Sequence, residues 1–275
     1  MNKTQLPIGV FDSGMGGLTV LKALKALLKN ESFIYLGDTA RLPYGTKSAE
    51  TVQQYALQMA RVLVERQIKA LVIACNTATT AALPHLQSVL EDIPVLGVVL
   101  PGATAAVSAT RNSRIAVLAT ETTIASQAYQ RFISAQLPHA VITPRACSLL
   151  VALAEEGMVN NTIAKEALKH YLVGLNQEDT LLLGCTHFPV FTRLLSDLLP
   201  EHMRVVDSAQ ATALALQQLL SEKELLNVEA QTKAGIYYCV TDSVQRFQRV
   251  GEIFLGEPLD ATSIELINAG LQDHG

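Results

Sequence analysis

Two of the four cysteines stand where a thiol could take part in proton transfer. Cys75 and Cys185 each end a short apolar run, and they are followed by Asn-Thr and Thr-His respectively. A thiol becomes a base when a helix N-terminus or a nearby cation favours its thiolate. Cys147 and Cys239 lie in apolar surroundings that are typical of buried structural cysteines. No Cys-x-x-Cys pair occurs, and Cys185 with His187 would lack further ligands, so the sequence does not predict a zinc site.

Thiols on opposite walls of one cleft could invert a tetrahedral carbon. One thiolate would remove a proton from the carbon, and the opposing thiol would deliver a proton to the other face. Asp12 follows the first predicted strand and His187 lies two residues after Cys185, so either could exchange a proton with a thiol. A helix N-terminus expected after each cysteine would add partial positive charge. A satisfied structural histidine is the alternative interpretation of His187.

Polar loops supply candidate binding groups. The turn 12–17, Asp-Ser-Gly-Met-Gly-Gly, could hold a carboxylate or phosphate on its backbone N–H groups. It lacks the G-x-G-x-x-G spacing, and the chain has no Walker A sequence, which argues against a nucleotide site. The segment 37–45 is long and polar for a strand-to-helix connection, as functional loops often are. Asn76, Thr77 and Thr186 could offer neutral hydrogen bonds to substrate carboxylates.

The elements that position these residues alternate between strand and helix. Strands are expected at 8–11, 33–36, 70–74 and 95–99, with helices at 18–29 and 48–67. Such alternation predicts βαβ units and a mostly parallel sheet. Ligands of open α/β sheets bind outside the carboxyl ends of the strands, where Asp12, Asp38 and both cysteines lie.

The pattern starts again near Arg114. The runs 115–119, 140–143, 180–184 and 204–206 correspond to the four strands above, at an offset of 107 residues (8 to 115) to 110 residues (75 to 185). The matched cysteines favour a true repeat over a chance similarity of two βαβ units. We therefore expect an α/β fold of two pseudo-symmetric α/β domains with mostly parallel sheets and the active site in the cleft between them.

The last part of the chain is expected to return to the first half. It contains a helix at 209–221, a strand at 235–241 and a helix at 243–254, and it need not form a third domain. This layout predicts a first domain of residues 1–97 plus 208–275 and a second domain of residues 98–207.

The composition and net charge argue against several classes of protein. The chain has 275 residues, of which 49% are hydrophobic and 17% charged, so it can bury a large core. A net charge of −4 without like-charge blocks gives no support to a nucleic-acid or membrane partner. The first residues are too poor in apolar side chains for a secretory signal, and a cytoplasmic location is expected.

Four motifs together resemble the bacterial glutamate racemases of the cofactor-independent aspartate/glutamate racemase superfamily. They span most of the chain, at 9–19, 36–45, 75–78 and 183–189. The resemblance implies interconversion of L- and D-glutamate without a cofactor or metal, a supply of D-glutamate for peptidoglycan, and a homodimer. His187 favours glutamate racemases over aspartate racemases, which tend to carry Glu at that position.

The resemblance also implies residue roles. Cys75 would act on the proton of the D-enantiomer and Cys185 on that of the L-enantiomer, with Asp12 and His187 assisting. Substrate contacts would come from Asp12, Ser13, Tyr44, Gly45, Asn76, Thr77, Thr186 and His187. An acidic residue assists in some members, and the sequence leaves Glu155 and Glu156 as candidates. The alternatives are an aspartate racemase or another superfamily member, and a non-catalytic two-lobed protein that binds a small anion.

Overall fold

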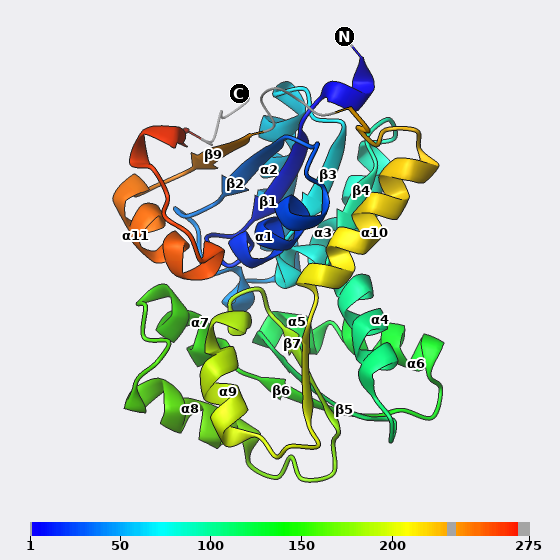
Figure 1. Cartoon of the computed structure of the whole chain (residues 1–275), viewed down its shortest axis with the longest axis vertical. Coiled ribbons are helices and arrows are strands. Elements are labelled where there is room, and N and C mark those ends of the chain that lie inside the picture. Colours follow the sequence, from blue (N-terminus) through cyan, green and yellow to red (C-terminus); the bar gives the residue numbers. More distant parts are fainter. Residues whose placement is uncertain (1, 230–234, 269–275) are drawn as a thin grey trace.

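The strands form two parallel sheets stacked end to end along the long axis of the molecule (Figure 1). The computed structural model describes residues 2–229 and 235–268. The larger sheet has the order β10-β9-β2-β1-β3-β4 and consists of β1 (Ile8–Asp12), β2 (Phe33–Gly37), β3 (Ala70–Ile73), β4 (Val95–Gly97), β9 (Ile236–Val240) and β10 (Ile264–Leu266). The smaller sheet has the order β6-β5-β7-β8 and consists of β5 (Arg114–Ala119), β6 (Val141–Ala146), β7 (Thr180–Gly184) and β8 (Arg204–Asp207). We call the larger sheet with its helices the first lobe, and the smaller sheet with its helices the second lobe.

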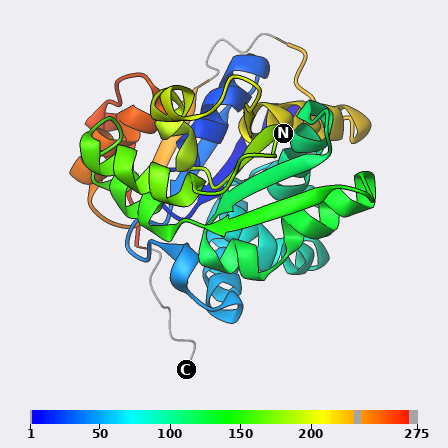
Figure 2. The same cartoon turned by 90° about the horizontal axis from the view of Figure 1, so that it is seen from below.

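Helices cover both faces of each sheet (Figures 1 and 2). The first lobe carries α1 (Leu18–Leu27), α2 (Ala49–Glu65), α3 (Asn76–Val89), α10 (Ala209–Glu222) and α11 (Val244–Leu255). The second lobe carries α4 (Val99–Ala109), α5 (Glu121–Ala125), α6 (Ala128–Gln136), α7 (Ser148–Glu155), α8 (Thr162–Leu172) and α9 (Thr192–Leu198). Short 3-10 helices lie at η1 (Lys3–Gln5), η2 (Tyr44–Thr46), η3 (Phe188–Phe191) and η4 (Ala261–Ser263).

The expected internal repeat is present in the strand order and in the register of the first and third strands of each unit, whereas Ile115 pairs with Ile142, two residues beyond the expected Ala140. The order β2-β1-β3-β4 of the first lobe has the same form as β6-β5-β7-β8 of the second. Ile8 pairs with Ala70 in the first lobe, and Ile115 pairs with Thr180 in the second, as the sequence offset predicts. The predicted α/β class and parallel sheets are confirmed.

The chain returns to the first lobe after β8. In this return β9 pairs with β2, with Tyr238 beside Tyr35, and β10 pairs with β9. These two strands extend the first sheet beyond the repeated four-strand unit. The residue limits of the two domains stay a prediction.

One predicted strand is too long. The expected strand 95–99 ends at Gly97, and α4 begins at Val99. Adjacent valines suggested a strand, but Val99 and Ala103 pack in the core of the second lobe when the segment is helical. Pro101 fits the first turn of this helix, where its missing N–H is not needed.

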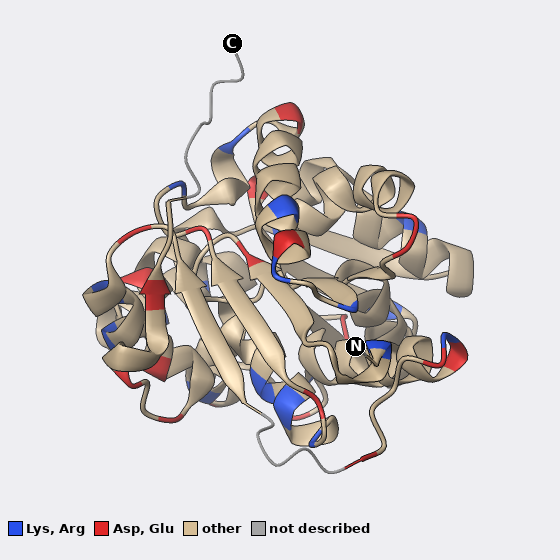
Figure 3. Ribbon diagram, turned by 90° about the horizontal axis from the view of Figure 1, so that it is seen from above, with Lys and Arg blue, Asp and Glu red and all other residues tan. Residues whose placement is uncertain are grey.

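Side chains of successive residues in the central strands pack alternately in the hydrophobic cores on the two sides of each sheet. Val10 packs in one cluster and the adjacent Phe11 in another, and both are fully buried. Charged residues of both signs are interspersed over helices and loops around the first lobe (Figure 3). None of the helices in the described ranges is long and apolar enough to cross a membrane.

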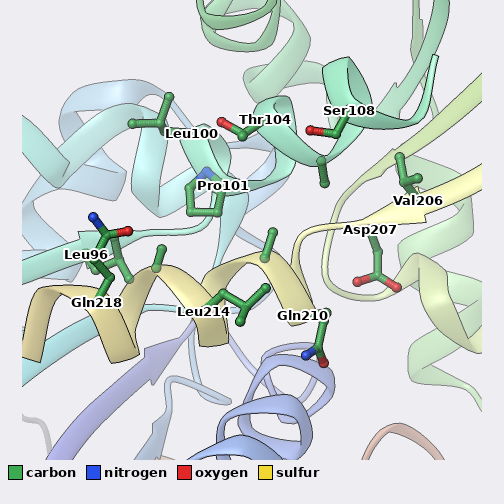
Figure 4. Close-up of a pocket in the computed structure, with 13 residues that line it drawn as sticks. Leu96, Leu100, Pro101, Thr104, Ser108, Val206, Asp207, Gln210, Leu214 and Gln218 are labelled. Atoms are coloured by element: carbon green, nitrogen blue, oxygen red, sulfur yellow. The ribbon is translucent and has the colours of Figure 1, made fainter. Parts of the chain in front are cut away.

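A groove of about 700 Å³ lies on the flank where α4, α10 and β8 meet (Figure 4). Its lining is mainly apolar, and Leu100 and Leu214 at its rim are about half exposed. Neither cysteine singled out by the sequence lines it, because both face a different and much smaller cavity between the strand ends.

Candidate active site

A small closed cavity lies where the strand ends of the two lobes face each other. Its volume is about 20 Å³, which is close to the space that one water molecule needs. Its walls are formed by Ser13, Leu42, Pro43, Tyr44, Gly45, Cys75, Asn76, Thr77, Thr120, Val151, Glu155, Cys185, Thr186 and His187. The structure therefore brings nearly all residues selected from the sequence to one place, and Cys75 and Cys185 enter it from different lobes.

Cys75 occupies the N-terminal end of a long helix. It is the N-cap of the 14-residue α3, and its Sγ accepts a hydrogen bond from the backbone N–H of Ala78 at 3.4 Å. Its thiol donates to Ser13 Oγ at 3.5 Å. The side chain is almost fully buried. Burial, with a smaller contribution from the Asp12 charge, raises the pKa of Cys75 to about 12. Cys75 is therefore a neutral thiol at neutral pH in this arrangement.

Asp12 lies behind the cavity wall instead of in it. Its carboxylate is fully buried, and Oδ2 accepts hydrogen bonds from the Gly14 N–H at 2.9 Å and from the Tyr35 hydroxyl at 3.4 Å. Burial raises the pKa of Asp12, and the charge of His187 acts in the opposite direction. Asp12 thus acts on Cys75 through its charge, while the hydrogen bond of the Cys75 thiol goes to Ser13.

Cys185 has a charged neighbour. Its Sγ lies 3.7 Å from Nδ1 of His187, and Nε2 of His187 lies 2.6 Å from Oε1 of Glu155. Burial alone would lower the pKa of His187, but its hydrogen bonds to Cys185 and Glu155 raise that pKa well above the usual range. The histidine is therefore an imidazolium held between a carboxylate and a sulfur.

The structure distinguishes between the two glutamates that the sequence left open. Glu155 ends α7, is almost fully buried and contacts His187. The side chain of Glu156 is 65% exposed and forms an ion pair with Arg246 at 3.1 Å. Glu155 is thus the one whose carboxylate borders the cavity.

The helix expected after Cys185 is present, but its first turn is a 3-10 turn. Residues 188–191 form the 3-10 helix η3, with Pro189 in its first turn, and α9 begins only at Thr192. The 3-10 turn continues into α9, so one helical segment, 188–198, begins three residues after Cys185. His187 adds positive charge beside the Cys185 sulfur.

Hydrogen bonds cross from one lobe to the other around the cavity. Thr77 Oγ1 and Thr120 Oγ1 lie 2.9 Å apart. Thr122 donates to the carbonyl of Gly45 at 2.9 Å. Thr19 of α1 donates to the carbonyl of Thr186 at 3.1 Å. These bonds hold the lobes in the closed arrangement.

Two glycines permit this close approach. A Cβ at Gly16 would lie 2.4 Å from Nδ1 of His187, and a Cβ at Gly45 would lie 2.6 Å from Cβ of Thr120. Any larger residue at either position would push the lobes apart or displace these side chains.

The loop that carries Tyr44 is organised by a buried carboxylate. Asp38 Oδ2 accepts hydrogen bonds from the Tyr44 hydroxyl and from Arg41 Nε, the latter at 2.7 Å, and Oδ1 accepts one from Thr241 at 2.9 Å. These contacts fix the polar segment 37–45 against the return strands of the first lobe. Tyr44 and Gly45 thereby line the cavity.

The sequence interpretation missed four lining residues, which are Leu42, Pro43, Thr120 and Val151. Thr120 could have been found from the sequence, because the offset of 107 residues that relates the first strands of the two lobes makes it the equivalent of Ser13. Val151 lies within an ordinary apolar helix, α7, and nothing in its surroundings marks it.

The other two cysteines, Cys147 and Cys239, do not line the cavity. Cys147 is fully buried at the start of α7, and Cys239 is fully buried within β9. Within residues 2–229 and 235–268 no group of three or more His, Cys, Asp or Glu side chains is placed to hold a metal ion.

Known proteins share this fold and sequence. A sequence model of the Asp/Glu/hydantoin racemase family matches residues 8–216. A glutamate racemase from Geobacter metallireducens is 48% identical over 254 residues, which cover 92% of this chain and 93% of the relative.

Two solved structures are similar over nearly the whole chain. A glutamate racemase from Francisella tularensis, in complex with D-glutamate, superimposes with a TM-score of 0.88 at 36% identity and covers 97% of this chain and 98% of its own. The glutamate racemase isoform RacE1 from Bacillus anthracis gives a TM-score of 0.89 at 35% identity and covers 96% of this chain and 98% of its own. The chain therefore belongs to the Asp/Glu/hydantoin racemase family and, within it, to the glutamate racemases.

Proposed function

We propose that this protein interconverts L- and D-glutamate by a two-base mechanism, in which one of Cys75 and Cys185 removes the Cα proton and the other delivers its own proton to the opposite face. The observation that carries the proposal is that two cysteines from different lobes line one closed cavity. The relative from Francisella tularensis, whose structure contains D-glutamate, supports the choice of substrate.

The cavity offers donors for the carboxylates of a dicarboxylic amino acid. Asn76 and Thr77 are the first two residues of α3, so their backbone N–H groups point out of the helix N-terminus. Such an end carries partial positive charge and favours an anion. Thr186 faces it from the second lobe. A substrate held between these groups would present its Cα to both sulfurs.

The L-to-D direction follows from the electrostatics of the two walls. The imidazolium of His187 favours the thiolate of Cys185, which removes the Cα proton. The Cys75 thiol, whose pKa is raised to about 12, delivers a proton to the opposite face. The C–H bond broken at one face is replaced by a C–H bond at the other, and the negative charge moves from Cys185 to Cys75.

The D-to-L direction reverses these roles. The Cys75 thiolate is then the base, and it is stabilised by the Ala78 N–H and the N-terminus of α3. Cys185 is the proton donor. The buried pair of His187 and Glu155 stays in place through the cycle, so the second wall does not need to gain or lose charge beyond the sulfur itself.

Substrate entry requires the two walls to separate. A cavity of about 20 Å³ is far smaller than the hundreds of Å³ that ligand sites usually enclose. The bonds from Thr120 to Thr77, from Thr122 to Gly45 and from Thr19 to Thr186 would break during opening. Closure around the substrate would then exclude water from the reacting carbon.

The resemblance makes further predictions that are part of the same proposal. These are a supply of D-glutamate for peptidoglycan, a homodimer, a cytoplasmic location, and the domain limits 1–97 plus 208–275 and 98–207.

A proton-exchange experiment tests the function. The purified protein is incubated with L-glutamate in D₂O, and NMR follows the Cα proton while chiral chromatography follows D-glutamate. We expect loss of the Cα proton signal together with D-glutamate formation. Exchange with L-aspartate but not with L-glutamate would indicate an aspartate racemase. Binding of glutamate without any exchange would identify a non-catalytic binding protein.

A further inference from the structure

Tyr129 reaches across the cleft to a residue of the cavity wall. It lies on α6 of the second lobe and is 1% exposed. Its hydroxyl donates a hydrogen bond to Oδ1 of Asn76, on α3 of the first lobe, at 2.6 Å. Tyr129 itself is not among the cavity-lining residues, and this hydrogen bond connects it to Asn76, which is.

The other half of the Asn76 amide is unused. Nδ2 of Asn76 is buried and has no hydrogen-bond partner among the described residues, although the side chain lines the cavity. A buried amide N–H₂ without an acceptor is unfavourable. An oxygen of a ligand in the cavity would supply that acceptor.

The position of the Tyr129 ring is fixed by packing. A Cβ at Gly184 would lie 2.7 Å from Cε2 of Tyr129, and a Cβ at Gly102 would lie 3.0 Å from its hydroxyl oxygen. The ring therefore occupies a slot that these two glycines leave open. Burial raises the pKa of Tyr129, so the phenol stays protonated and remains a donor.

We propose that Tyr129 is a positioning residue that fixes the orientation of the Asn76 amide, so that Nδ2 donates to a carboxylate oxygen of the amino-acid substrate. The terminal torsion of an asparagine side chain is broad, and the two ends of its amide are similar in shape. With the tyrosine hydroxyl bound to Oδ1, the donor end is turned toward the ligand. The proposal rests on the proposed function, because the carboxylate is that of glutamate.

The test removes only the hydroxyl. Tyr129→Phe is compared with the parent and with Tyr171→Phe, which alters a tyrosine of α8 that does not line the cavity. We expect Tyr129→Phe to raise KM for both enantiomers about tenfold while kcat changes less than about threefold. Tyr171→Phe should leave both constants unchanged.

A double-mutant cycle separates positioning from general stability. In an Asn76→Ala background, Tyr129→Phe should change KM less than about twofold, because the amide that it orients is gone. If Tyr129→Phe weakens both backgrounds by the same factor, the hydroxyl does not act through Asn76 and the proposal is wrong. Melting temperatures of all variants show whether a loss reflects unfolding. Should Asn76→Ala be too slow to assay, D-glutamate binding by calorimetry replaces KM in the same cycle.

A second variant tests the slot itself. Gly102→Ala should raise KM in the parent, because its methyl group pushes on the Tyr129 hydroxyl. In Tyr129→Phe the same change should raise KM by a smaller factor, since the contact with the hydroxyl is absent and the tight contact with Cβ of Ser208, at 3.1 Å, remains. Additive effects of the two changes would overturn the proposal. A parent protein that racemises glutamate normally in these assays leaves the proposed function standing even then.

Discussion

Cys75 and Cys185 follow equivalent strands of two similar sheets, but different kinds of group surround them. Cys75 caps the 14-residue α3 and bonds to the hydroxyl of Ser13, and burial keeps it a neutral thiol. Cys185 precedes the short η3 and lies beside the imidazolium of His187, which Glu155 holds in place. The comparison shows that a repeated backbone fixes where the sulfurs lie, while non-repeated neighbours give each sulfur different hydrogen bonds and charges.

The largest expected effect comes from removing either sulfur. Cys75→Ala and Cys185→Ala should each lower racemisation by about 10³-fold or more, because one face of Cα then lacks its acid–base group. Chiral chromatography measures the loss. In D₂O, Cys75→Ala should still exchange the Cα proton of L-glutamate and Cys185→Ala that of D-glutamate. Racemisation at the parent rate by either variant would show that the two-base mechanism is wrong.

The second-largest effect is expected on the Cys185 side of the cavity, which carries the charged pair of His187 and Glu155. His187→Asn should lower kcat/KM about 10²-fold and Glu155→Gln about tenfold, since both weaken the positive charge beside Cys185. Glu156→Gln is the matched control, because its side chain is exposed and should leave steady-state kinetics unchanged. Equal losses for Glu155→Gln and Glu156→Gln would show that contact with His187 is not what matters.

The third effect is a difference in thiol reactivity. At pH 8 iodoacetamide should modify Cys185 at least about tenfold faster than Cys75, as measured by peptide mass spectrometry. Because the pKa of Cys75 is raised to about 12, its thiolate fraction and labelling rate should rise about tenfold per pH unit between pH 7 and 9.5. A plateau for Cys75 in this range would contradict a buried neutral thiol.

The smallest effect is expected on the Cys75 side. Ser13→Ala removes the acceptor that lies 3.5 Å from the Cys75 sulfur. Thiol hydrogen bonds are weak, and the Ala78 N–H remains, so kcat should fall only about threefold. A loss as large as that of His187→Asn would mean that the two walls depend equally on their polar neighbours.

Much of the site could be predicted because parallel strands carry polar residues at one common edge. Cys75, Cys185 and Thr186 follow such strands, and the constant offset between halves placed the two sulfurs opposite each other. Side-chain direction on a helix is harder to predict. Glu155 and Glu156 differ by one position, which turns a side chain by about 100° around the axis, and only packing shows which one reaches His187.

Long-range contacts without a local pattern could not be predicted. Tyr129 lies in an ordinary amphipathic helix, and its contact with Asn76 joins residues 53 positions apart. The strand predicted through Val99 was wrong because β-branched residues fit a helix when its buried face packs well. In both cases tertiary packing decided what local propensity left open.

Thermodynamics limits what the different surroundings of the two sulfurs can do. L- and D-glutamate have equal free energies in water, so their equilibrium constant is unity and kcat/KM must be the same for both substrates. The unequal surroundings of Cys75 and Cys185 therefore cannot favour either product. Where kcat differs between the two directions, KM must differ by the same factor, and every active variant must obey the same equality. Two related lobes that each bring one thiol to the cleft suit a reaction whose forward and reverse directions are mirror images.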